Sequence, residues 1–112
     1  MEKYTYNGED FKVVISNDNW KLGLLRYSER FSCACVFERH LKTDEAFILL
    51  YGDAILYIKD ENGVVEETKM EPSTVYNVLK GEWHHIVVSK DATVLVVENS
   101  DTSKENTEKV II

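Results

Sequence analysis

Residues 38–45 read Glu38-Arg39-His40-Leu41-Lys42-Thr43-Asp44-Glu45 and join two segments that have the pattern of β-strands. The segment before the junction runs from Phe31 to His40, and the almost wholly apolar segment after it runs from Ala46 to Tyr51. A connection as short as residues 41–44 suits antiparallel neighbours, because parallel strands need a crossover of about a dozen residues or more. This stretch therefore predicts an antiparallel β fold.

The same alternation of short apolar segments and turns continues on both sides of the junction. Further strands are expected at Phe11–Ile15, Trp20–Tyr27, Ala54–Lys59, Val64–Met70, Val75–Val78, His84–Ser89 and Thr93–Glu98. Asn62-Gly63 has the sequence of a tight hairpin turn, and no segment shows a sustained helical period. Many short strands separated by turns predict an all-β barrel or jelly roll.

Length and charge narrow the class of protein. The 112 residues suit one domain, with a polar tail over 99–112 whose last residues, 110–112, can dock on the body. A net charge of -7 argues against nucleic acid as a partner, because binding to phosphates needs a basic surface. No apolar segment has the length of a membrane span, and the N-terminus lacks a signal core. We therefore expect a cytoplasmic protein that binds neither nucleic acid nor membrane.

Cys33 and Cys35 are two residues apart in the expected strand. Extended geometry separates their Cα atoms by about 6.5–7 Å, with Cβ vectors that do not converge. We therefore expect a reduced pair, in keeping with a cytoplasmic protein. Buried packing thiols are the favoured interpretation, and a redox or soft-metal role for this C-x-C is the alternative.

Glu38 and His40 lie on the same face of their strand, because side chains two residues apart point the same way. Glu45, after the short connection, can fold back beside them. Imidazole and carboxylate ligands suit divalent Mn, Fe, Ni, Co or Zn. In the simpler alternative, Glu38 and His40 only pair with each other, and Glu45 is a solvated residue at the start of a strand.

Two motifs in this chain resemble those of the cupin superfamily. The first cupin motif reads H-x-H, three or four residues, E, six residues, G, and here Glu38-x-His40 is followed at these spacings by Glu45 and Gly52. The second reads P-x-G-x-x-H, and residues 79–84, LKGEWH, are similar to it. The resemblance covers residues 34–98. Glutamate at position 38 and leucine at position 79 depart from the usual histidine and proline.

The resemblance implies a cupin-like double-stranded β-helix over residues 1–112, with the core motifs in 34–98. It also implies that His84 joins Glu38, His40 and Glu45 as a fourth ligand of a divalent metal. His85 alternates to the opposite face. Phe47 and Leu49 share the parity of Glu45 and are expected to line the pocket, where Arg26 could meet an anionic ligand. Of these two interpretations of Arg26, a surface residue is the favoured one.

We expect a small-molecule-binding cupin, with three forms of that hypothesis open. It can be a metal-dependent enzyme acting on a small polar metabolite, or a ligand-binding or sensing protein without metal. It can also be a mainly structural dimer. The strand from Phe31 to Phe37, apolar on both faces, suggests a homodimer. Whether the chain is an enzyme, and which reaction it would catalyse, are left open because fold does not fix chemistry.

Overall fold

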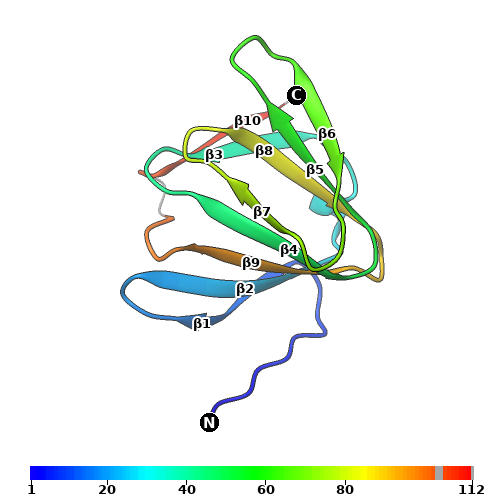
Figure 1. Ribbon diagram of the computed structural model, residues 1–112, viewed down its shortest axis with the longest axis vertical. Helices are drawn as coiled ribbons and strands as arrows, with labels where there is room; N and C mark the ends of the chain where they lie inside the picture. The colour runs from blue at the N-terminus through cyan, green and yellow to red at the C-terminus, as the bar shows by residue number, and fades with distance from the viewer. Residues whose placement is uncertain (103–104, 112) are drawn as a thin grey trace.

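The computed structural model describes residues 1–102 and 105–111, which form two five-stranded antiparallel sheets facing each other (Figure 1). In chain order the strands are β1 (Phe11–Ser16), β2 (Trp20–Arg26), β3 (Val36–His40), β4 (Glu45–Tyr51), β5 (Ala54–Lys59), β6 (Val65–Lys69), β7 (Val75–Val78), β8 (Trp83–Val88), β9 (Thr93–Asn99) and β10 (Thr107–Ile111). One 3-10 turn, η1, covers Glu29–Phe31. Among the described residues, no helix has the length and apolar character needed to cross a membrane.

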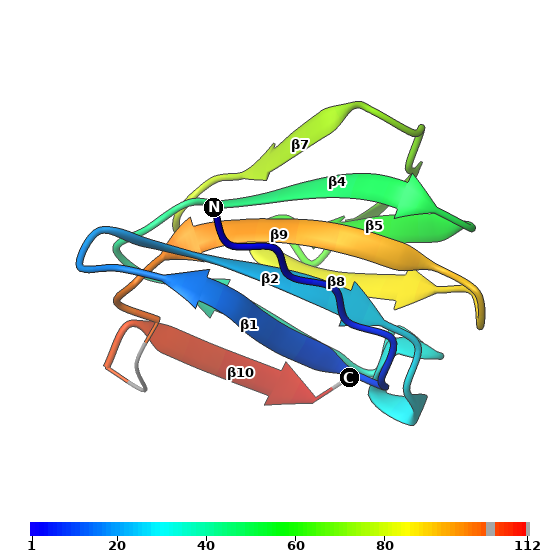
Figure 2. The same cartoon turned by 90° about the horizontal axis from the view of Figure 1, so that it is seen from below.

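The first sheet has the strand order β1-β2-β9-β4-β7, and the second has β10-β3-β8-β5-β6. The chain passes between the two sheets repeatedly, as from β3 to β4 and from β8 to β9, which is the connectivity of a jelly roll. Strands β1 and β10 are edge strands on the same side of the molecule (Figure 2). The all-β antiparallel fold expected from the sequence is confirmed.

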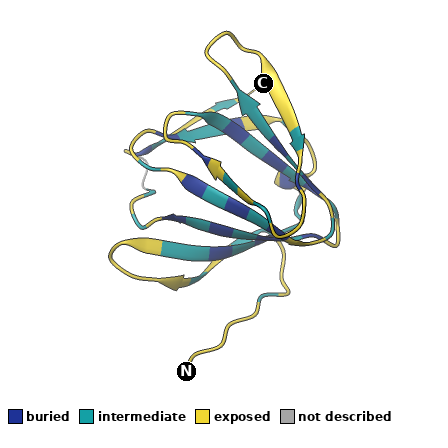
Figure 3. Ribbon diagram, viewed as in Figure 1, coloured by how far each residue is buried: buried dark blue, intermediate teal, exposed yellow. Residues whose placement is uncertain are grey.

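The core fills the space between the sheets. Alternate residues of each strand point inward, so buried and half-buried residues alternate along β4, β8 and β9 (Figure 3). Phe47, Leu49, Val94 and Val96 from the first sheet meet Leu56, Ile86 and Val88 from the second in one hydrophobic cluster. At one end of these inward faces the apolar residues give way to His40, Glu45, His84 and Glu98, all of which are buried.

The expected strand from Phe31 to His40 is wrong in its first half. β3 begins at Val36, and the residues before it form a loop in which Cys33 and Cys35 are joined by a disulfide. Their Cα atoms lie 5.5 Å apart, closer than the roughly 6.5–7 Å of an extended strand. The reduced pair expected from strand geometry is therefore also wrong, because this segment is not extended and its two sulfurs are bonded.

The expected polar tail contains a tenth strand. β10 pairs antiparallel with β3, and Ile111 is opposite Val36. Glu108 and Lys109 are exposed, as suits an edge strand, and their polarity hides the strand in the sequence. Of the expected docking residues Val110-Ile111-Ile112, Val110 and Ile111 lie in this strand, and Ile112 lies outside the described residues.

Asn106, fully buried, ties the start of β10 to the connection between β3 and β4. Its side-chain oxygen accepts a hydrogen bond from the Lys42 amide at 2.7 Å, and its side-chain nitrogen donates to Thr43 Oγ1 at 2.9 Å and to the Asp101 carbonyl. Its own carbonyl accepts a bond from the Leu41 amide. A buried amide with these partners holds the loop next to Glu45 in a defined position.

Candidate metal centre

Four side chains converge at the polar end of the core. Glu38 and His40 come from β3, Glu45 is the first residue of β4, and His84 comes from β8. One ligand atom from each lies within 4.8 Å of all the others. His84 Nε2 is 2.9 Å from Glu45 Oε1, and His40 Nε2 is 3.5 Å from the same oxygen and 3.9 Å from Glu38 Oε1.

The backbone brings these residues together through pairing and one tight turn. Glu38 and His84 are directly opposite each other in the ladder between β3 and β8. Gly81 has φ of 84°, a conformation that favours glycine, and its amide donates to the His40 carbonyl at 2.7 Å. The turn that leads into β8 is thus bonded to β3, which fixes His84 relative to His40.

The outer nitrogens of both imidazoles are oriented by neighbours. His40 Nδ1 is 3.0 Å from Thr107 Oγ1, and His84 Nδ1 is 3.3 Å from the Glu82 carbonyl. Each ring therefore turns Nε2 toward Glu45, in the arrangement by which partners outside a metal site orient its histidines. His40 Nε2 is buried and makes no hydrogen bond within the described chain. A buried nitrogen without a hydrogen bond beside two carboxylates fits a bound cation.

Glu98 is a further acidic residue at this centre that the sequence interpretation missed. It is opposite Glu45 in the ladder between β4 and β9, is hydrogen-bonded to it, and lies 3.7 Å from Lys21 Nζ. Burial and the hydrogen bond to Glu45 raise the pKa of Glu98 to about 9. Strand alternation could have identified it, because Glu98 lies on the same face of its strand as the inward-facing Val94 and Val96.

The pKa of the Glu45 carboxyl is shifted in the opposite direction, downward. Burial acts to raise its pKa, but the nearby imidazole of His40 and the hydrogen bonds with His84 and Glu98 outweigh burial and hold the pKa well below its ordinary value. For His84, burial acts to lower the pKa, and the hydrogen bond with Glu45 more than compensates, so the pKa is raised. The centre therefore holds Glu45 as a carboxylate beside a protonated Glu98, and the imidazole of His84 can share its proton with that carboxylate.

A cavity of about 760 Å³ lies between the sheets and includes all four residues in its wall. Phe47 lines it together with Phe11, Phe31 and Ile86, so one wall is apolar. Leu49 is buried in the core and does not line the cavity. Arg26 lies outside the lining as well, and its guanidinium donates to the Gly8 carbonyl and to Thr93 Oγ1. Arg30, three residues after Tyr27, does contribute to the lining.

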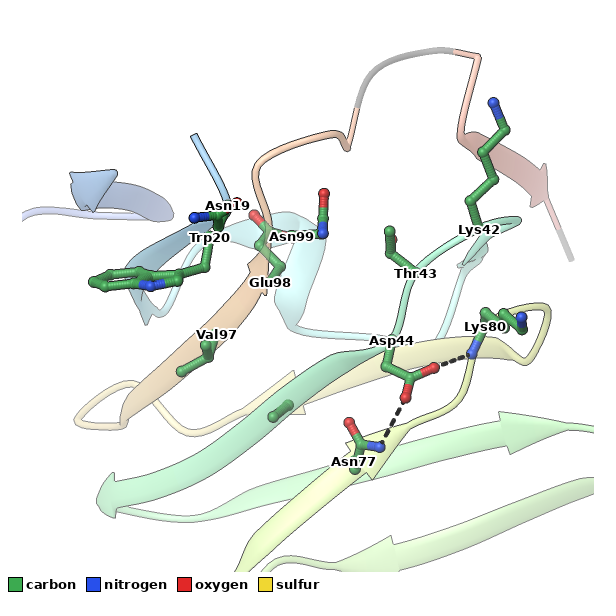
Figure 4. Close-up of a pocket in the computed structure, with 11 residues that line it drawn as sticks. Asn19, Trp20, Lys42, Thr43, Asp44, Asn77, Lys80, Val97, Glu98 and Asn99 are labelled. Atoms are coloured by element: carbon green, nitrogen blue, oxygen red, sulfur yellow. Dashed lines mark hydrogen bonds between the residues drawn. The ribbon is translucent and has the colours of Figure 1, made fainter. Parts of the chain in front are cut away.

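A second hollow of about 590 Å³ lies at the outer end of the first sheet (Figure 4). Its wall includes Trp20, Lys42, Asp44 and Lys80. Asp44 accepts hydrogen bonds from the Lys80 amide at 2.8 Å and from Asn77 Nδ2 at 3.2 Å, which lower its pKa. These bonds fasten the β3–β4 connection to the turn before β8, so they help to position the residues of the candidate metal centre.

No family model matches the sequence, and no curated protein matches it. Solved structures do match the fold. Pac13, a nucleoside dehydratase, has a TM-score of 0.72 with 9% identity over 99% of this chain and 93% of its own. A cupin-2 domain protein of Shewanella frigidimarina has a TM-score of 0.64 with 16% identity over 84% of both chains.

Oxalate decarboxylase of Bacillus subtilis, with a TM-score of 0.64 and 21% identity, matches over 83% of this chain. This chain spans only about a quarter of that enzyme, 24% of its length. These likenesses concern the fold, and they agree with the two motifs around Glu38 and His84 and with the jelly-roll connectivity. By fold, this chain is similar to small single-domain cupins.

Proposed function

We propose that this chain binds one divalent transition metal ion through Glu38, His40, Glu45 and His84 and holds a small polar molecule in the adjoining cavity. The convergence of four ligand atoms from three strands within 4.8 Å carries the proposal. Three of the four residues are buried, and an ion would give Nε2 of His40 the bonding partner that it lacks among the described residues. Mixed nitrogen and oxygen ligands suit Mn, Fe, Co, Ni or Zn.

The cavity supports a small-molecule role. Its apolar wall can hold the body of a ligand, while the polar end presents imidazoles and carboxylates to oxygen or nitrogen atoms. A bound ion would supply Lewis acidity, and two carboxylate ligands would neutralise much of its charge. Related folds carry different chemistries, as the names oxalate decarboxylase and nucleoside dehydratase indicate. An enzyme acting on a small polar metabolite is the proposal, without a choice of reaction.

A binding or sensing protein without metal is the alternative. One observation favours it: Glu45 is already paired with His84 at 2.9 Å and hydrogen-bonded to Glu98. These groups can satisfy one another without an ion and present the remaining polar atoms to a ligand.

Metal titration distinguishes the metal-binding proposal from the metal-free alternative. Protein prepared without a histidine tag and stripped by chelator is titrated calorimetrically with Mn²⁺, Co²⁺, Ni²⁺ and Zn²⁺, and elemental analysis is made of the protein as purified. The proposal expects saturation near one ion per chain for at least one metal. Absence of binding for all four, in protein that remains folded by circular dichroism, would favour the metal-free alternative.

We also propose a homodimer, through a surface other than the one the sequence suggested. Phe31 and Phe37 are buried within their own chain, so they cannot supply the interface. The outward face of the first sheet can, because its central residues form apolar rows across the strands. The rows contain Leu22, Val97 and Ala46 in one register and Leu24, Leu95, Ile48 and Val75 in the next. Such a face suits a twofold contact with a second copy.

Light scattering tests the dimer. The wild-type chain is expected at twice its 13.0 kDa mass, and Leu95→Glu, in the middle of the face, is expected at the monomer mass. Val65→Glu, at an exposed position of β6 in the second sheet, is the matched control and is expected to remain a dimer. A monomeric wild-type protein at micromolar concentration would refute the assembly. Dimers in all three proteins would refute the proposed surface.

A further inference from the structure

The Cys33–Cys35 disulfide forms part of the cavity wall. Both cysteines line the cavity that contains Glu38 and His84, and both are exposed to solvent. Val36 and Ile111, also exposed, line the cavity beside them, and together these four residues form what we call the exposed rim. The chain has two cysteines in total, so no third thiol competes for the bond.

The disulfide does little to hold the fold together. It closes a ring around a single residue, Ala34, and a ring of this size restricts the unfolded chain less than any longer loop would. The loop is anchored by other means, since the buried rings of Phe31 and Phe37 lie 6.4 Å and 6.3 Å from the ring of His85. Opening the bond should therefore leave both anchors, and the two sheets, in place.

The bond constrains the loop against its sequence preference. Residues 31–40 have the pattern of one continuous strand, yet β3 begins only at Val36. The disulfide holds the Cα atoms of Cys33 and Cys35 at 5.5 Å, below the roughly 6.5–7 Å of an extended strand. When the bond opens, the segment is free to extend toward β3, and the exposed rim changes shape with it.

We propose that Cys33 and Cys35 are a redox-active pair that exchanges with small thiols and changes the shape of the exposed rim. A thiolate of a monothiol such as glutathione attacks one sulfur, the S–S bond breaks, and a mixed disulfide forms. A second thiol then displaces the protein sulfur, so that two protein thiols and one oxidised thiol dimer result. Solvent exposure gives the attacking thiol access. Transient disulfides of this kind also occur in the cytoplasm that the sequence predicts.

The first test is thiol trapping in the native state. Oxidised protein is incubated in buffers of graded reduced and oxidised glutathione, quenched with iodoacetamide, and analysed by mass spectrometry. Reversible conversion between forms with no and two alkyl groups is expected, with circular dichroism unchanged. Reduction that occurs only when denaturant is added would overturn the proposal. The trapping involves no metal, so its outcome is independent of the proposed metal centre.

The second test follows the rim. Hydrogen exchange is compared between oxidised and reduced protein, and a severalfold change is expected at the amides of residues 33–36, with β8 unchanged. Binding of the dye 8-anilinonaphthalene-1-sulfonate, used as a probe of the apolar cavity wall, is expected to change severalfold as well. The double variant Cys33→Ser/Cys35→Ser should match the reduced wild type, and Ala34→Ser, which keeps the bond, should match the oxidised one. Identical exchange and dye binding in both wild-type forms would refute the change of shape.

Discussion

Replacing His84 with alanine is expected to weaken binding of Co²⁺ by at least about 100-fold. Loss of a residue that only orients a ligand typically costs 10–100-fold, and His84 is itself one of the four converging ligands. Its Nε2 lies 2.9 Å from Glu45, so its removal also leaves that buried carboxylate without its nearest imidazole. Calorimetric titration of the chelator-stripped protein measures the loss.

The neighbouring histidine provides a matched control. His85 alternates with His84 along β8, and its ring contacts Phe31 and Phe37. It lines the same cavity but is not one of the four converging residues, so His85→Ala removes an imidazole without removing a proposed ligand. The affinity of the His85→Ala variant for Co²⁺ is expected to stay within about threefold of that of the wild type, a change of less than roughly 1 kcal/mol in binding free energy. Equal losses in both variants would mean that the effect comes from destabilisation of β8, and no loss in His84→Ala would refute the ligand assignment.

Metal binding should also increase the free energy of unfolding. A ligand present at about 100 times its dissociation constant stabilises the folded state by about 2.7 kcal/mol. The wild type and His85→Ala should gain this increment from Co²⁺ in thermal unfolding, and His84→Ala should not. The comparison is made within each variant, with and without the ion, so a general loss of stability in one variant does not obscure it.

Local periodicity is enough to predict most of the fold and part of the centre. Alternation places Glu38 and His40 on one face, and the short connection after them places Glu45 nearby. His84 lies about forty residues further on, and only the motif spacing relates it to that cluster. The structure brings all four together, because the register between β3 and β8 sets Glu38 opposite His84.

The missed features depend on contacts between distant segments. Glu98 is a charged residue near the end of its strand, a pattern that predicts a surface position. Only the pairing of β4 with β9 places Glu45 opposite it. β10 reads as a polar tail because it is an edge strand, and its pairing with β3 is not encoded in its own composition. The disulfide contradicts the strand preference of residues 33–35, so local pattern alone predicts the wrong geometry there.

Glu38 differs from the other three residues of the centre in burial. Its side chain is 34% exposed, against 4–7% for His40, Glu45 and His84. Position 38, where the cupin motif that this chain resembles has histidine, is thus the most solvated of the four, and a carboxylate is least costly to keep charged there. The buried part of the centre retains two imidazoles and one carboxylate, and Lys21 offsets part of the charge near Glu98.

The metal-free protein is expected to lose stability as the pH rises from about 5 to 9. Glu98 has a folded pKa of about 9 against an ordinary value of 4.5, so its contribution is complete below pH 4.5 and is lost as the pH rises toward 9. His84 acts in the same direction, because its folded pKa lies above 6.5. Glu45 has the opposite sign: its contribution is present above pH 4.5 and is lost as the pH falls through its lowered pKa.

Replacing Glu98 with glutamine should remove most of the loss of folding stability at alkaline pH. The amide keeps a donor for the Glu45 carboxylate but has no proton to release, so the variant should resemble the wild type near pH 5 and exceed its stability at pH 9. The difference should be on the order of 2–3 kcal/mol, since one pKa unit corresponds to about 1.4 kcal/mol and the polar cavity screens part of the shift. Urea unfolding in the presence of chelator measures it, with the exposed Glu67→Gln on β6 as the control that should track the wild type. If the stability of Glu98→Gln fell with pH as steeply as that of the wild type, Glu98 would not hold its proton in the folded state, and the pairing of Glu98 with Glu45 would have to be reassigned.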